Sequence, residues 1–127
     1  MMNVVDSSAW LEFFANNPLA SVFEEPIRDL QHLVVPTITV LEVHKKATRQ
    51  RGADYASECI AQMMGGAIIP LSLQLALSSS DVGRQYDLPL ADSVVYATAL
   101  AVNGLTWTCD SDFKDLPNVR YFDKRQK

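Results

Sequence analysis

Short runs of apolar residues alternate with longer stretches of helical periodicity along this 127-residue chain. The apolar runs, rich in β-branched residues, predict buried strands at residues 3–5, 33–35, 67–69, 105–108 and 119–122. The stretches between them predict helices over residues 9–14, 19–25, 39–51, 54–64, 72–86 and 90–102. This alternation indicates an α/β fold, with one domain over residues 1–127 and a central parallel sheet of about five strands that has helices on both faces.

Some boundaries carry a local signal. Pro26 is expected to end the second helix, because proline lacks the backbone N–H that a continuing helix needs. Thr39 and Glu42 have the spacing of a capping box, in which both side chains bond to backbone N–H groups at a helix start. The polar residues 123–127 are expected to be frayed.

Isolated acidic residues stand just past strands or at helix starts. Asp6 ends the first strand, Glu42 lies beyond the second, and Asp92 opens the last helix. Asp110 follows the fourth strand, and Asp112 comes two residues later. Ligands of open parallel sheets bind beyond the carboxyl ends of the strands, so we expect these acids, apart from Asp112, to converge on one pocket. Taken singly, each could instead cap a helix or shape a turn.

Converging carboxylates need a counter-ion. Two of them about 5 Å apart repel by roughly 3 kcal/mol at an effective dielectric near 20. Hard oxygen ligands without Cys or His favour Mg²⁺ or Mn²⁺ over zinc. Such an ion would activate water and shield a phosphodiester during in-line attack. Ser7 and Thr108 could orient a water or an acidic ligand, although Ser7 could equally belong to a helix cap.

The net charge of −4 argues against a generally basic nucleic-acid binder, so binding of a polyanion would need a local basic patch. Lys45, Lys46, Arg49 and Arg51 supply one. The first three lie on the same helical face as Glu42, so a basic stripe would lead outward from the acidic pocket. It could bind RNA phosphates, or it could simply be a solvated helix face.

The remaining candidates for chemistry are weaker. The first residues lack the pattern of a signal peptide, and no apolar run has the length of a membrane span, so we expect a cytoplasmic protein. Cys59 and Cys109 are expected to be structural thiols, since neighbouring carboxylates disfavour a Cys109 thiolate. His32 precedes a strand and His44 points off the pocket face, so both are assigned to the surface or to packing.

The chain resembles PIN-domain ribonucleases, and among them the VapC-type toxins of prokaryotic toxin–antitoxin pairs. Four segments carry the resemblance: Val4-Val5-Asp6-Ser7-Ser8, Pro36-x-x-Thr39-x-x-Glu42-Val43, Leu90-x-Asp92 with Ala97-Thr98-Ala99-Leu100, and Thr108-x-Asp110-x-Asp112-Phe113. The resemblance implies a PIN-like fold, RNA cleavage with Mg²⁺ or Mn²⁺, a small cognate antitoxin that blocks the site, and a homodimer. It covers nearly the whole chain.

Carried over by motif, Asp6, Asp92 and Asp110 correspond to metal ligands. Glu42 completes the acidic set as a further ligand or as the orienter of the attacking water. Thr108 matches the hydroxyl residue of the closing motif, and Asp112 its second acid, whose role varies. Many relatives have a basic residue after that threonine, whereas here the position is Cys109, which puts a substrate contact in doubt.

The resulting hypothesis is a metal-dependent endoribonuclease that acts as the toxin of a type II toxin–antitoxin pair. A second interpretation is a phosphohydrolase on small phosphate esters, although such enzymes carry their acidic pair after the first strand. A third is a non-catalytic module whose acidic pocket holds a metal only to bind a partner. Cleavage of RNA, turnover of a chromogenic phosphate ester and tight partner binding without turnover would distinguish the three.

Overall fold

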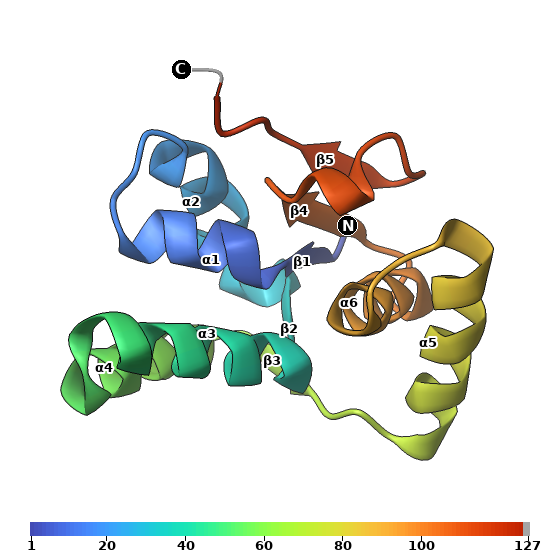
Figure 1. The fold of residues 1–127 in the computed structure, drawn as a ribbon, viewed down its shortest axis with the longest axis horizontal. Helices are drawn as coiled ribbons and strands as arrows, with labels where there is room; N and C mark the ends of the chain where they lie inside the picture. The colour runs from blue at the N-terminus through green and yellow to red at the C-terminus, as the bar shows by residue number, and fades with distance from the viewer. Residues whose placement is uncertain (126–127) are drawn as a thin grey trace.

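The computed structural model describes residues 1–125 of the chain. Within this part, five parallel strands form one sheet in the order β3-β2-β1-β4-β5 (Figure 1). The strands are β1 (Asn3–Val5), β2 (Leu33–Pro36), β3 (Ala67–Ile69), β4 (Leu105–Thr108) and β5 (Val119–Tyr121). The first strand is therefore central, and its neighbours β2 and β4 come from distant parts of the sequence.

Helices occupy most of the remaining chain. They are α1 (Ser7–Phe14), α2 (Ala20–Arg28), α3 (Thr37–Arg51), α4 (Ala53–Met63), α5 (Leu73–Tyr86) and α6 (Leu90–Ala101), with single 3-10 turns η1 (Leu30–His32) and η2 (Ser111–Phe113). Among the residues that the structure describes, no helix is both long and apolar enough to cross a membrane. The predicted α/β fold with a five-stranded parallel sheet is confirmed.

The two faces of the sheet bury two separate apolar clusters, because side chains alternate along a strand. Val5 and Val35 face a cluster built with α1 to α4, in which Trp10 and Phe23 are fully buried. Val4 faces the second cluster, which α6 and η2 complete. Helices therefore cover both faces, as predicted (Figure 1).

Two helix boundaries that were predicted from local signals are wrong. The second helix does not stop at Pro26 but continues to Arg28, because Pro26 lies in the last turns and its ring and Ile27 are buried. Burial of these apolar groups offsets the backbone hydrogen bond that proline cannot make. The capping box is also wrong: α3 begins at Thr37, and the Thr39 hydroxyl donates to the Pro36 carbonyl oxygen at 2.7 Å.

The C-terminal segment is partly described. Of residues 123–127, expected to be frayed, 126 and 127 lie outside the described residues. Arg125 donates from its backbone and guanidinium N–H groups to the Asp123 carboxylate, which forms a local turn after β5.

Candidate metal centre

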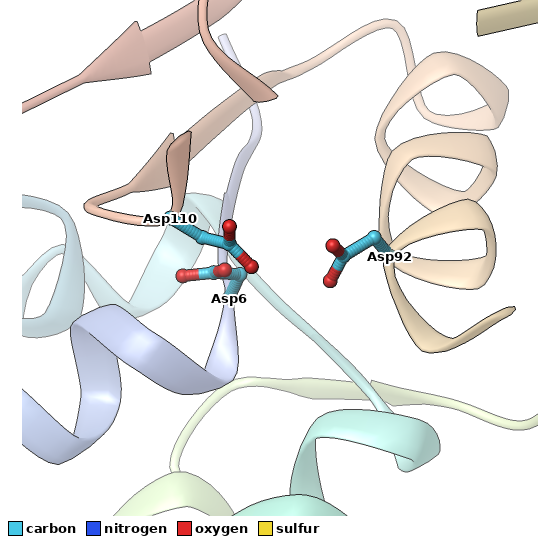
Figure 2. Close-up of side chains that lie close together, drawn as sticks. All are labelled: Asp6, Asp92 and Asp110. Carbon is cyan, nitrogen blue, oxygen red and sulfur yellow. The ribbon is translucent and has the colours of Figure 1, made fainter. Parts of the chain in front are cut away.

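Three aspartates meet at the carboxyl edge of the sheet (Figure 2). Asp6 directly follows β1, Asp110 lies two residues past β4, and Asp92 is in the first turn of α6. One carboxylate oxygen from each lies within 4.8 Å of the others. The convergence follows from topology, because β1 and β4 are parallel neighbours whose ends coincide, and the Asp6 N–H donates to the Trp107 carbonyl.

Asp6 is the most buried member of this aspartate cluster, with 2% of its surface exposed. Its Oδ1 accepts from the Ser8 hydroxyl at 2.7 Å and from the Ala9 N–H at 3.1 Å. Its Oδ2 accepts from the Thr108 hydroxyl at 2.9 Å. Burial raises the pKa of Asp6 to about 7, although these hydrogen bonds favour the charged form and lower it in part.

The pKa of Asp92 is shifted further from its ordinary value than the pKa of Asp6. Burial, followed by the negative charges of Asp110 and Asp6, raises the pKa of Asp92 to about 8. Two charged carboxylates 4.8 Å apart repel by roughly 3.5 kcal/mol at an effective dielectric near 20. The aspartate cluster therefore holds its full negative charge at neutral pH only with help from a cation.

The donor set fits a hard divalent ion. All three groups are carboxylates on rigid elements, and in the described chain the cluster contains no Cys or His ligand. Carboxylate oxygens are the ligands of Mg²⁺, Mn²⁺ and Ca²⁺ rather than of structural zinc. Asp6, Asp92 and Asp110 could hold such an ion between them.

Glu42 is not a member of the aspartate cluster. Its Oε1 accepts a hydrogen bond of 2.9 Å from the Ser7 hydroxyl, which ties α3 to the start of α1. The Ser7 side chain therefore binds Glu42 and does not cap α1. The residue that caps α1 is Asp6. With its capping-box role excluded, Glu42 is an acid on the helix that follows β2.

The polar residues of the closing motif, Thr108 to Phe113, have different hydrogen-bond partners. The Thr108 hydroxyl accepts from the Asp110 N–H at 2.9 Å while it donates to Asp6. Asp110 Oδ1 accepts from the Asp112 N–H at 2.9 Å, which caps η2. The Asp112 side chain is exposed and stands outside the aspartate cluster.

Ser8 was not singled out in the sequence, yet it donates to Asp6 at 2.7 Å and accepts from the Cys109 N–H at 3.3 Å. The sequence signal that could have identified Ser8 is a hydroxyl two residues after an aspartate at a strand end, a spacing at which side chains often bond locally. Cys109 is 6% exposed, and burial raises the pKa of its thiol, in keeping with its predicted lack of nucleophilic character.

The predicted basic stripe is exposed along α3. At about 100° per residue, Lys46 and Arg49 lie within about 40° of the Glu42 direction, and Lys45 lies further round the helix. Arg51 points to the opposite side, where its guanidinium carbon lies 4.2 Å from the centre of the Tyr55 ring. The stripe thus consists mainly of Lys46 and Arg49 beside Glu42.

Both histidines lie away from the aspartate cluster. His32 pairs with Asp29 at 3.0 Å on the surface. His44 is exposed and lines a mostly apolar groove between α3, α4 and β3. Their predicted surface roles agree with these positions.

The fold and the site together define a class of protein: an α/β domain with an acidic pocket, suited to a cation, at the carboxyl edge of its sheet. The family model of the PIN domain matches residues 4–119, so the chain belongs to the PIN domain family. A comparison with curated proteins finds no match.

Solved structures of similar fold include complexes of toxins with antitoxins. A toxin–antitoxin complex from Klebsiella pneumoniae is 21% identical, with 93% of this chain and 95% of that chain covered and a TM-score of 0.76. VapBC2 from Rickettsia felis, bound to a promoter DNA fragment, is 13% identical, with coverages of 97% and 100% and a TM-score of 0.74. VapC20 from Mycobacterium tuberculosis, a toxin that cleaves the sarcin-ricin loop, is 14% identical, with coverages of 87% and 92% and a TM-score of 0.70. At these identities the similarity shows a shared fold.

Proposed function

We propose that this PIN-domain protein is a metal-dependent endoribonuclease and the toxin of a type II toxin–antitoxin pair. The observation that carries the proposal is the cluster of Asp6, Asp92 and Asp110 at the carboxyl edge of the sheet. The fold shared with toxins of this kind supports it. A protein that cuts cellular RNA would act in the cytoplasm.

In this proposal the three aspartates hold Mg²⁺ or Mn²⁺. A bound ion of this kind lowers the pKa of water and neutralises charge on a scissile phosphate. Asp6 is suited to hold it because three donors orient its carboxylate. Glu42, tethered by Ser7, would orient the attacking water or add a further ligand.

The substrate in this proposal is RNA, bound in part by the basic side chains of α3. Lys46 and Arg49 would contact phosphates beside the acidic pocket, and Lys45 would do so further round the helix. Arg51 could reach only a part of the RNA that passes the opposite side of α3, where it packs over Tyr55. Because water is the attacking group, the 2′-hydroxyl is not consumed. The products should therefore carry 5′-phosphate and 3′-hydroxyl ends.

The decisive experiment incubates the purified protein with total RNA in Mg²⁺, in Mn²⁺ and in a chelator. Cleavage that needs the divalent ion, with 5′-phosphate products, supports the ribonuclease. Turnover of a chromogenic phosphate ester without RNA cleavage would instead support a phosphohydrolase. Neither activity, together with tight binding of a small protein, would support a non-catalytic module.

The partner in this proposal is a small antitoxin, and the toxin itself would form a homodimer. Phe13 and Phe14 are only partly buried, and they line a hollow of about 400 Å³ whose other walls include the polar side chains of Glu24 and Arg28. Such a hollow offers a partner two aromatic rings within a mostly polar surface. The complexes formed by similar folds support the antitoxin. Co-expression with the protein encoded beside it, followed by sedimentation of each species, tests both statements.

A further inference from the structure

Two hydroxyl groups hold the two oxygens of Asp6. Ser8 donates to Oδ1 at 2.7 Å and Thr108 donates to Oδ2 at 2.9 Å. Each hydroxyl in turn accepts from a consecutive backbone N–H of the turn after β4: Cys109 N to Ser8 at 3.3 Å, and Asp110 N to Thr108 at 2.9 Å. The Asp6 carboxylate is thus clamped from both sides.

The direction of the Ser8 bond follows from its partners. A serine hydroxyl has one proton and two acceptor positions. Cys109 approaches that oxygen with its N–H at 3.3 Å and with its thiol at 3.4 Å, and both of these groups are donors. The single proton of Ser8 is therefore left for Asp6, and a carboxylate is the stronger acceptor available to it.

We propose that Ser8 is a positioning residue of the metal centre, held in its donor orientation by Cys109, so that Cys109 acts on the centre through Ser8 and not through the substrate. The inference rests on the proposed metal-dependent function. It concerns a hydroxyl to which the sequence alone assigned no role, although Ser8 lies two residues after Asp6. It also gives a role to the cysteine that stands where many PIN toxins have a basic residue.

Loss of the Ser8 hydroxyl should lower the metal affinity of the site. Groups that orient a metal ligand typically change affinity by 10- to 100-fold when they are removed. Ser8→Ala leaves Asp6 with the Ala9 N–H and the Thr108 hydroxyl, so its carboxylate loses one of three donors. We therefore expect Mn²⁺ affinity to fall about tenfold in Ser8→Ala. Ser8→Thr restores a hydroxyl and should restore the affinity.

The test titrates Mn²⁺ into the full chain by calorimetry for the parent, Ser8→Ala, Ser8→Thr, Cys109→Ala and the double variant Ser8→Ala/Cys109→Ala. Cys109→Ala should weaken binding by less than Ser8→Ala, because only the thiol donor is lost. The double variant should match Ser8→Ala, because the Cys109 thiol donates to the Ser8 hydroxyl and acts on Asp6 through it. The matched control is Ser79→Ala, a buried serine of α5 that bonds to the Leu75 carbonyl and should keep the parent affinity.

Three results would overturn the proposal: a parent that binds no Mn²⁺, parent affinity in Ser8→Ala, or a further loss when Cys109→Ala is added to Ser8→Ala. A purely structural Ser8 would lower the unfolding midpoint in chelator and leave affinity unchanged. If Ser8→Ala does not fold, as judged by circular dichroism, unchanged affinity in Cys109→Ala overturns the role given to the cysteine. Ser8-dependent Mn²⁺ binding without RNA cleavage would refute the proposed ribonuclease and leave this inference standing.

Discussion

At the scale of single residues, Asp6 belongs to two structures. Its Oδ1 accepts from the Ala9 N–H and caps α1, while an oxygen of the same carboxylate lies within 4.8 Å of its counterparts on Asp92 and Asp110. The two roles coincide because α1 begins directly where β1 ends. A capped helix start at a strand end therefore brings a buried carboxylate to the sheet edge.

The first prediction concerns Asp92→Asn. Loss of a direct ligand should reduce RNA cleavage at least about 100-fold, since even indirect supports of a metal ligand cost 10- to 100-fold. The fold should persist, because the substitution also removes the repulsion that Asp6 and Asp110 exert on this side chain. Cleavage at saturating Mg²⁺ and unfolding in urea measure the two effects. Parent-like cleavage by the folded variant would refute the site.

The second prediction is a pH dependence of the metal-free protein. The folded-state pKa values of Asp6 and Asp92 are raised to about 7 and about 8, so between pH 4 and these values the folded state binds more protons than the unfolded state. Stability contributed by these groups is therefore complete below pH 4 and is lost as the pH rises through 7 and 8.

Comparison of the parent with Asp92→Asn isolates this effect from the other titrating groups. The unfolding free energy of the variant, relative to the parent, should increase from pH 5 to pH 9 in chelator. Urea unfolding at each pH provides the measurement. A difference that does not change with pH would contradict the raised pKa of Asp92.

Part of this site could be predicted from the sequence. Asp6 and Asp110 follow strands, and the rule that ligands lie at the carboxyl edge of a parallel sheet places them together. The role of Glu42 could not be settled, because its spacing from Thr39 also suits a capping box. The Ser8–Cys109 contact joins residues 101 positions apart and depends on side-chain rotamers, which no local pattern reveals.

At the scale of elements, α3 separates three environments around its axis. Val43 and Ala47 are buried in the first cluster, Glu42 faces the start of α1, and Leu41 is exposed. The helix was predictable from its length and period, but its start was not. The misleading signal was the spacing of Thr39 and Glu42, which suits a capping box. In the structure the Thr39 hydroxyl instead bonds back to the Pro36 carbonyl, at the turn between strand and helix.

The third prediction compares two adjacent methionines at the end of α4. Met63 is fully buried and Met64 is 65% exposed. Met63→Ala should cost about 2–5 kcal/mol of unfolding free energy, because it removes transfer free energy and leaves a cavity. Met64→Ala should stay within about 0.5 kcal/mol of the parent. Chemical denaturation of both variants tests the pair, and equal losses would contradict the packing of α4.

The fourth prediction concerns the Glu42 face of α3. In an Asp92→Asn background, where RNA stays intact, Lys46→Ala and Arg49→Ala should each weaken RNA binding. Each should also reduce the salt dependence of log Kd by about 0.7 for single-stranded RNA, because one phosphate contact is lost. The control is Arg84→Ala, an exposed arginine of α5 that pairs with Asp81. Equal effects of all three changes would indicate non-specific attraction.

At the scale of the whole molecule, the site exists only when the sheet is complete. β1 pairs with β4 across about a hundred residues of sequence, and α6 must pack on the second face before Asp92 reaches the other two aspartates. The order of the elements made this arrangement predictable in outline. Distances and pKa shifts required the assembled chain, because they arise from burial shared by several elements.

The last prediction follows from that dependence. Because the aspartate cluster is absent from the unfolded chain, a metal bound there stabilises the folded state by RT ln(1 + [L]/Kd), about 2.7 kcal/mol at 100 times Kd. For a domain of this size that corresponds to a rise in Tm of roughly 10 °C. Asp92→Asn should show a much smaller rise, because it lacks one of the three carboxylates.

Thermal unfolding of parent and variant in chelator and in a Mn²⁺ series provides the measurement. The parent Tm should climb with the logarithm of Mn²⁺ concentration above Kd, and the Asp92→Asn curve should begin to climb only at a higher concentration. Met64→Ala serves as the control because its exposed side chain lies just past the end of α4, outside the aspartate cluster. Its Mn²⁺ response should match the parent. The same Mn²⁺ response in parent and Asp92→Asn would mean that the ion binds elsewhere, and the carboxyl edge of the sheet would lose its role as the metal centre.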